Sequence, residues 1–184
     1  MRVVTGPMGS GKTTVLQILK DKGFSVLRAD DLAKNFMDED FFQRMKERFP
    51  FVSSREQFST EFFQRRDLKL WVEREIHPKV YGELRHSSVD FAEIPLYFES
   101  WEIAREAGFI PHSVVYVTLD KALRMERLKK YRAMGEEEIS LREQYFMKEE
   151  RKMRLSDYIL YNDGSLETLK ERVEEYLRCE NLDL

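Results

Sequence analysis

The chain has 184 residues, 42% of them hydrophobic and 35% charged, and its formal net charge of −3 argues against general nucleic-acid binding. This length suits a single domain with a continuous core, and no apolar run approaches the roughly 20 residues that a membrane-spanning helix needs. The single cysteine, Cys179, can form no internal disulfide, and no signal peptide precedes the first predicted strand, so we expect a cytoplasmic protein.

A glycine-rich loop follows the first predicted strand, residues 2–5. Residues 6–14 read Gly-Pro-Met-Gly-Ser-Gly-Lys-Thr-Thr, and a helical pattern comes next. Strand, loop and helix in this order predict a P-loop, in which backbone N–H groups and a helix N-terminus hold nucleotide phosphates. Lys12 is expected to reach the β- and γ-phosphates, and the Thr13 hydroxyl to ligate Mg²⁺. The predicted nucleotide ligands are Met8, Gly9, Ser10, Gly11, Lys12, Thr13 and Thr14.

A carboxylate follows the second predicted strand, residues 24–28. Ligands of open α/β sheets bind at the carboxyl ends of the strands, so Asp30 is expected near the P-loop. There it can orient an acceptor hydroxyl and take its proton during phosphoryl transfer. In the alternative interpretation, Asp30 only caps a helix that begins near Leu32. Asp31 is the more natural cap or first-turn residue, which leaves Asp30 free for chemistry.

The stretch between the second and third predicted strands, residues 29–88, reads as almost entirely helical. A segment of this length is not expected to be a structureless loop in a compact domain. We therefore predict that residues 31–88 form a helical substrate-binding insertion, which is packed mainly by its own aromatic residues. Within it, His77-Pro78 is interpreted either as part of the substrate site or as the start of a helix, because proline suits the first helical turn.

Residues 89–94 predict a third strand, which Pro95 ends. A GTPase would need an Asp-x-x-Gly segment after this strand and an Asn-Lys-x-Asp segment later, and the sequence has neither. No aspartate ends the strand as in a Walker-B motif. Asp90 and Glu93 are present, but strand alternation can point either of them to solvent. The expected Mg²⁺ ligands are therefore Thr13, the phosphates and water, with Asp30 as a candidate for the outer shell.

The remaining elements complete an alternating pattern. Residues 113–119 and 158–161 predict two further strands, and residues 121–132, 136–154 and 166–178 predict helices. Strands that alternate with helices are typical of a parallel sheet with right-handed crossovers. The sequence therefore predicts an α/β protein: a three-layer α/β/α P-loop kinase fold with a five-stranded parallel sheet, a helical insertion and a lid.

Basic side chains gather in the predicted helix 121–132. We interpret this stretch as a lid whose cations close over the transferring phosphoryl group, with Arg127 and Arg132 as the favoured donor-phosphate ligands. The alternative is an ordinary solvated helix face, because Glu126 lies among the basic residues. The basic residues of the stretch are Arg124, Arg127, Lys129, Lys130 and Arg132.

Several segments together resemble the dephospho-CoA kinase family of P-loop proteins. Besides the P-loop, they are Leu27-Arg28-Ala29-Asp30-Asp31-Leu32-Ala33-Lys34, Gln64-Arg65-Arg66-Asp67-Leu68, Ile76-His77-Pro78, Pro95-Leu96-Tyr97-Phe98-Glu99, and 156–164 around Asn162. The resemblance spans nearly the whole chain. It implies phosphorylation of the ribose 3′-hydroxyl of dephospho-CoA, with ATP as donor, Mg²⁺ as cofactor and Asp30 as the catalytic aspartate.

The resemblance also implies site residues and a division of the chain. Lys34, Arg65, His77 and Glu99 are expected on the acceptor side, and Asn162 near the adenine of ATP. Glu99 is alternatively a helix-start residue favoured by the dipole, and Asn162 a plain turn residue. A single kinase domain is expected to comprise a core (1–30, 89–120 and 155–184), a CoA-binding insertion (31–88) and a lid (121–154). It is expected to act as a monomer or small homo-oligomer.

The chain departs from the family pattern at several positions. Arg28 stands where the family has an aspartate, and Tyr131 where it has a second lid arginine, with Arg132 one place late. The segment between Leu68 and His77 is shorter than usual, and a glutamine is replaced around residues 146–147. These changes leave two other functions open: a kinase of another small acceptor, such as a nucleoside monophosphate or a sugar acid, and a nucleotide-sensing module without catalysis.

Overall fold

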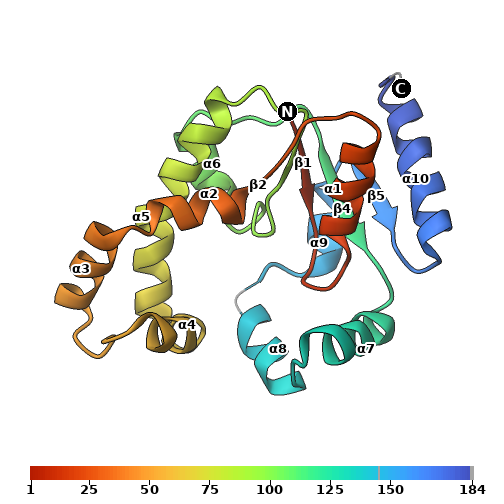
Figure 1. Ribbon diagram of the computed structural model, residues 1–184. Coiled ribbons are helices and arrows are strands. Elements are labelled where there is room, and N and C mark those ends of the chain that lie inside the picture. Colours follow the sequence, from red (N-terminus) through yellow and green to blue (C-terminus); the bar gives the residue numbers. More distant parts are fainter. Residues whose placement is uncertain (145, 183–184) are drawn as a thin grey trace.

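The computed structural model describes residues 1–144 and 146–182. Five parallel strands form one sheet in the spatial order β2-β3-β1-β4-β5 (Figure 1). The strands are β1 (Arg2–Thr5), β2 (Val26–Arg28), β3 (Phe91–Glu93), β4 (Val114–Thr118) and β5 (Tyr158–Tyr161). Each lies within a range that the sequence predicts, so the five-stranded parallel sheet is confirmed.

Helices connect the strands and cover both faces of the sheet (Figure 1). They are α1 (Lys12–Asp21), α2 (Ala29–Phe36), α3 (Glu39–Arg48), α4 (Arg55–Gln64), α5 (Arg66–His86), α6 (Trp101–Glu106), α7 (Lys121–Arg132), α8 (Glu136–Glu143), α9 (Glu149–Arg154) and α10 (Leu166–Cys179). None of the described helices is long and apolar enough to cross a membrane.

The alternation of side chains along each strand builds a separate core on each face of the sheet. Val3 packs on one face in a cluster that includes Ile76 of α5 and Ala104 of α6. Its neighbour Val4 packs on the other face with Leu16 of α1 and Val173 of α10. The predicted three-layer α/β/α arrangement is therefore confirmed.

The region between β2 and β3 is helical, as predicted, and consists of α2 to α5. In Figure 1, α3 and α4 lie away from the sheet, and α5 leads back towards it. Aromatic side chains pack this region: Phe41 stacks on Trp71 with ring centroids 5.3 Å apart, and Phe42 meets Phe58 edge-on at 5.6 Å. Buried residues of α5 from Leu68 onward belong to the core cluster that also contains strand residues, so this region and the sheet share a core.

Two sequence predictions about helices are wrong. His77-Pro78 does not begin a helix, because both residues lie inside α5. The predicted helix 136–154 is divided into α8 and α9. Between the two helices, the backbone N–H of Met147 donates to the Glu99 carboxylate at 3.1 Å. Residue 145 of the predicted lid and the last two residues of the predicted core lie outside the described residues.

Candidate active site

The P-loop connects β1 to α1 and leaves the start of α1 open. Gly11 occupies the N-cap position with a left-handed backbone (φ 92°), no side chain caps the helix, and its first turn has no acidic residue. The first N–H groups of the helix are therefore available to an anion, with the helix dipole in its favour. Glycine is required at this position, because a Cβ on Gly11 would lie 2.2 Å from Nδ2 of Asn162.

Asn162 holds the P-loop from the end of β5. Its Nδ2 donates to the backbone carbonyl of Ser10 at 2.8 Å, and its side chain is buried. Asn162 is therefore more than a plain turn residue. It also lines the cavity described below, whereas Ser10 does not: the Ser10 side chain is fully buried, and its N–H donates to Pro7 within the loop.

Lys12 lies buried under the P-loop. Its Nζ donates to the carbonyl oxygens of Gly6 and Pro7 at 3.0 and 2.9 Å. Burial lowers the Lys12 pKa from 10.5 to about 8; the negative charge of Glu93 opposes this shift, and the positive charge of Arg132 adds to it. A partly desolvated ammonium at this position is suited to bind phosphate oxygens. These charged acceptors would replace the two carbonyl oxygens, which are weaker acceptors.

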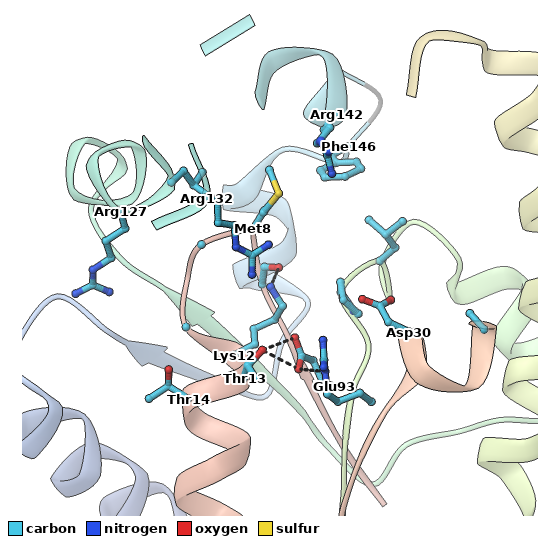
Figure 2. Close-up of a pocket in the computed structure, with 18 of the residues that line it drawn as sticks. Met8, Lys12, Thr13, Thr14, Asp30, Glu93, Arg127, Arg132, Arg142 and Phe146 are labelled. Atoms are coloured by element: carbon cyan, nitrogen blue, oxygen red, sulfur yellow. Dashed lines mark hydrogen bonds and ion pairs between the residues drawn. The ribbon is translucent and has the colours of Figure 1, made fainter. Parts of the chain in front are cut away.

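Asp30 faces the P-loop across a cavity of about 760 Å³ that both Lys12 and Asp30 line. Figure 2 shows its carboxylate directed into the cavity from α2, opposite Lys12. The alternative in which Asp30 caps a helix near Leu32 is wrong, because α2 begins at Ala29, Arg28 occupies the N-cap position, and no side chain caps the helix. Asp31 lies in the first turn, as expected, and accepts from Lys34 at 2.9 Å.

Glu93 is a site residue that the sequence interpretation left undecided. It ends β3, is only 5% exposed, and accepts from the Thr13 hydroxyl at 3.2 and 3.4 Å through its two oxygens (Figure 2). Asp90 instead binds Ser25 at the other end of the strand. The feature that could have identified Glu93 as a site residue is its position at the end of a strand that lies beside β1. Its orientation follows from the sheet register, in which it pairs with Val4.

The hydroxyl of Thr13 and the carboxylate of Glu93 fit the needs of Mg²⁺, which prefers oxygen ligands and usually keeps several waters. Within the described residues, no group of three or more His, Cys, Asp or Glu side chains could hold a metal ion. These two residues could therefore hold only part of the coordination sphere, and phosphates and water would supply the rest.

The lid residues lie at different depths. Arg127 and Arg132 line the cavity, and Figure 2 shows Arg132 directed towards Lys12. Nη1 of Arg127 donates to the backbone carbonyl of Asn162 at 3.0 Å. Arg124 is buried, pairs with Glu143 at 2.5 Å, and donates to the carbonyl of Met8, so it fixes α7 to the P-loop. Lys129, Lys130 and Arg132 are all exposed, as on a solvated helix face, but of these three only Arg132 also lines the cavity.

His77 and the aromatic residues Phe62 and Phe63 also line the cavity. Burial lowers the His77 pKa to about 4, and the positive charge of Lys69 adds to the shift, so the imidazole is neutral at physiological pH. Its buried Nδ1 has no partner among the described residues. Across the cavity, the guanidinium of Arg142 from α8 lies 4.0 Å from the ring centroid of Phe63 on α4. This contact joins the predicted lid to the helical region, and no periodic pattern in the sequence indicates it.

Three residues predicted on the acceptor side do not line the cavity. Lys34 is exposed and binds Asp31. Arg65 binds Glu61 at 2.7 Å and lies over the ring of Phe51. Glu99 pairs with the buried Lys152 at 2.5 Å. Glu99 is not a helix-start residue either, because it precedes the Ser100 N-cap of α6. A contact of these residues with substrate stays a prediction.

Comparison with known proteins gives consistent matches over most of the chain. The family model for dephospho-CoA kinase matches residues 2–168. The dephospho-CoA kinase of Helicobacter pylori is 30% identical over 189 residues, which cover 95% of this chain and 94% of that protein. A crystal structure from Thermus thermophilus has a TM-score of 0.80 and 30% identity, covering 97% of this chain and 96% of the other. The dephospho-CoA kinase from Campylobacter jejuni shares the fold, with a TM-score of 0.65, 23% identity, and coverage of 96% and 94%.

Proposed function

The chain belongs to the dephospho-CoA kinase family, and we propose that Lys12 and Asp30 carry out its reaction, the ATP-dependent phosphorylation of dephospho-CoA to coenzyme A. The acceptor atom in this proposal is the ribose 3′-hydroxyl oxygen. The observation that carries the proposal is that both side chains line one cavity, Lys12 from the P-loop and Asp30 from the strand end opposite it. This arrangement provides a phosphate site and a proton acceptor with room for an alcohol between them.

The donor phosphates would bind at the open start of α1. The N–H groups of the P-loop donate hydrogen bonds to the phosphate oxygens, and the Nζ of Lys12 exchanges the carbonyl oxygens of Gly6 and Pro7 for phosphate oxygens. Thr13 and Glu93 would hold Mg²⁺. When bound, this ion offsets negative charge on the β- and γ-phosphates. The hydrogen bond from Asn162 keeps Ser10 in place when the P-loop binds the phosphates.

Phosphoryl transfer requires little covalent chemistry from the protein, whose side chains mainly position the reactants and offset charge. The acceptor oxygen forms a bond to the γ-phosphorus while the bond from that phosphorus to the β,γ-bridging oxygen breaks and ADP leaves. The Asp30 carboxylate orients the hydroxyl and takes its proton. Arg132 lies opposite Lys12 in the cavity and offsets charge on the equatorial oxygens, and Arg127 supports the nucleotide from the Asn162 side. His77, neutral because burial lowers its pKa to about 4, adds no positive charge near Asp30.

A panel of acceptors tests this function. ATP consumption is measured with dephospho-CoA, nucleoside monophosphates and sugar acids, and Lys12→Ala serves as the control for contaminating activity. The proposal predicts turnover with dephospho-CoA far above the other acceptors, and its near loss in the control. Preferential turnover of another acceptor would show a kinase of different specificity. Tight ATP binding with no turnover of any acceptor would show a sensing module.

The setting of the enzyme is part of the proposal. A cytoplasmic location is supported by the single cysteine, which is exposed and can make no internal disulfide. Each chain carries both the donor and the acceptor groups of its cavity, so a monomer is sufficient for catalysis, and a small homo-oligomer would repeat the same site. Light scattering at assay concentration gives the number of subunits.

A further inference from the structure

Arg28 and Glu93 are neighbours across two parallel strands. The register of β2 and β3 pairs them directly, so their side chains project from the same face of the sheet at its carboxyl end. The Nε of Arg28 lies 3.4 Å from Oε2 of Glu93, the same oxygen that accepts from the Thr13 hydroxyl at 3.2 Å. A cation of the protein therefore stands beside the carboxylate proposed to hold Mg²⁺.

Arg28 and Glu93 form an ion pair, but the Arg28 Nε makes no hydrogen bond to the carboxylate. The Arg28 Nε is buried and has no hydrogen-bond partner within the described residues, although an oxygen of Glu93 lies near it. The other partner of Arg28 is Asp31 at 3.8 Å, an exposed carboxylate that already binds Lys34. Glu93 itself is nearly fully buried. A buried carboxylate needs a counter-charge. Lys12 provides part of it, and Arg28 adds to it without an optimal hydrogen bond that a metal cation would have to break.

We propose that Arg28 is a positioning residue that holds the Glu93 carboxylate beside the Thr13 hydroxyl and competes with a divalent cation for its charge. The inference rests on the proposed function of Thr13 and Glu93 as metal-holding residues. In the absence of metal, Arg28 offsets the charge of Glu93. In its presence, the two cations share one carboxylate and repel each other, so Arg28 weakens metal binding and favours release of the ion with the product nucleotide.

Direct binding of Mn²⁺ tests the proposal without turnover. Free Mn²⁺ is measured by electron paramagnetic resonance in titrations of the protein with saturating ADP, for the wild type, Arg28→Gln and Arg28→Lys. Removing a positive charge this close to a metal-holding carboxylate is expected to tighten Mn²⁺ binding by about threefold to tenfold in Arg28→Gln. Arg28→Lys keeps the charge and is expected to stay near the wild type. Asp31→Asn, which removes only the exposed partner of Arg28, is the matched control.

Each other outcome contradicts the proposal. Unchanged or weaker Mn²⁺ binding in Arg28→Gln would show that Arg28 does not compete with the ion. A raised KM for dephospho-CoA with unchanged Mn²⁺ affinity would make Arg28 a substrate contact instead. If the wild type with ADP binds no Mn²⁺ at all, the metal role of Thr13 and Glu93 fails and this inference fails with it, while the acceptor panel still decides whether the chain is a dephospho-CoA kinase. If Arg28→Gln folds poorly, Arg28→Met removes the same charge with a different side chain and is expected to tighten Mn²⁺ binding to the same extent; unchanged binding would contradict the proposal.

Discussion

Among single residues, Lys12 combines two needs that oppose each other: it must be buried to meet phosphates away from water, and it must keep its proton. Burial lowers its pKa to about 8 in the nucleotide-free protein. Below this pH the ammonium is charged and attracts phosphate; above it the amine is neutral and does not. Bound phosphate favours the charged form, so nucleotide binding above pH 8 should be accompanied by proton uptake.

We therefore expect the affinity for ATP, measured by calorimetry without acceptor, to fall as the pH rises through about 8. Far above that pH the loss approaches about tenfold per pH unit, because binding then requires one proton. Lys12→Arg is the control, since a guanidinium stays charged across this range. Its ATP affinity should be weaker at pH 7 but nearly independent of pH. An equal pH dependence in both proteins would assign the titration to another group.

Asn162 offers a second prediction for a single residue. Asn162→Ala removes the bond to the Ser10 carbonyl and leaves that buried carbonyl without its partner, which typically costs about 1–3 kcal/mol. Because the affected loop is the phosphate site, ATP affinity should fall along with the free energy of unfolding measured in urea. Asn35→Ala, at an exposed position of α2, is the control and should change neither. A normal ATP affinity in Asn162→Ala would mean that the loop keeps its shape without this bond.

Among the elements, α9 fixes the end of the lid to the segment after β3. Lys152 of α9 and Glu99 form an ion pair whose side chains are 6% and 15% exposed, and Glu99 also accepts from the backbone N–H of Met147. This pair stands where the chain leaves α8 and returns to the core. The helix does not continue from α8 into α9. The buried ion pair between Lys152 and Glu99 therefore holds the predicted lid in position relative to the sheet.

Lys152→Met should destabilise the protein by about 3 kcal/mol in urea unfolding, because it leaves the Glu99 carboxylate buried without its cation. Lys129→Met provides the matched control, since Lys129 pairs with Glu136 at 2.6 Å in an exposed position, where such pairs contribute about 0–1 kcal/mol. Replacing both Glu99 and Lys152 with apolar residues should recover part of the loss. Equal losses in Lys152→Met and Lys129→Met would contradict the structural role given to the buried pair.

In the molecule as a whole, the predicted phosphate site lies at the end of the sheet. Two separate regions, the predicted lid and the helical region, contact each other across the cavity. The lid contributes Arg142, the helical region contributes Phe63, and the two are in contact at 4.0 Å. Leu128 of the lid also packs against the P-loop, close enough that a Cβ on Gly9 would lie 2.8 Å from it. A ligand that binds between these elements is therefore expected to hold both of them.

Hydrogen exchange can follow this coupling. A non-hydrolysable ATP analogue together with dephospho-CoA should slow amide exchange in α4 and α8 more than either ligand alone, because the ligands complete the surface that Arg142 and Phe63 share. The second half of α10, residues 173–179, packs on the opposite face of the sheet and does not line the cavity. It is the internal reference and should change little. Phe63→Leu should reduce the extra protection of α8. Uniform protection of all helices would indicate general stabilisation instead of closure over the substrates.

The features of the molecule that follow from its sequence depend on chain order and spacing. The strand–loop–helix order places Lys12, and the parallel sheet places Asp30 at the same edge, so both residues were predictable. The orientation of Glu93 was not, since it depends on the register of three strands and not on any local pattern. The contact of Arg142 with Phe63 joins segments far apart in the chain and has no periodic signal. Of the two interpretations of His77-Pro78, the helix start was wrong, because tertiary packing of α5 outweighs the tendency of proline to begin a helix.

Single-turnover phosphoryl transfer by Asp30→Asn tests the central claim most directly. Wild type and variant are mixed with ATP and dephospho-CoA, and the rate of product formation is measured beside the dissociation constant of ATP. We predict a rate about 10²-fold lower, at the modest end for a lost general base because the transition state is loose, with ATP binding unchanged. Asp31→Asn, the same chemical change one residue later, should transfer at the wild-type rate. Transfer by Asp30→Asn at the wild-type rate would contradict the account.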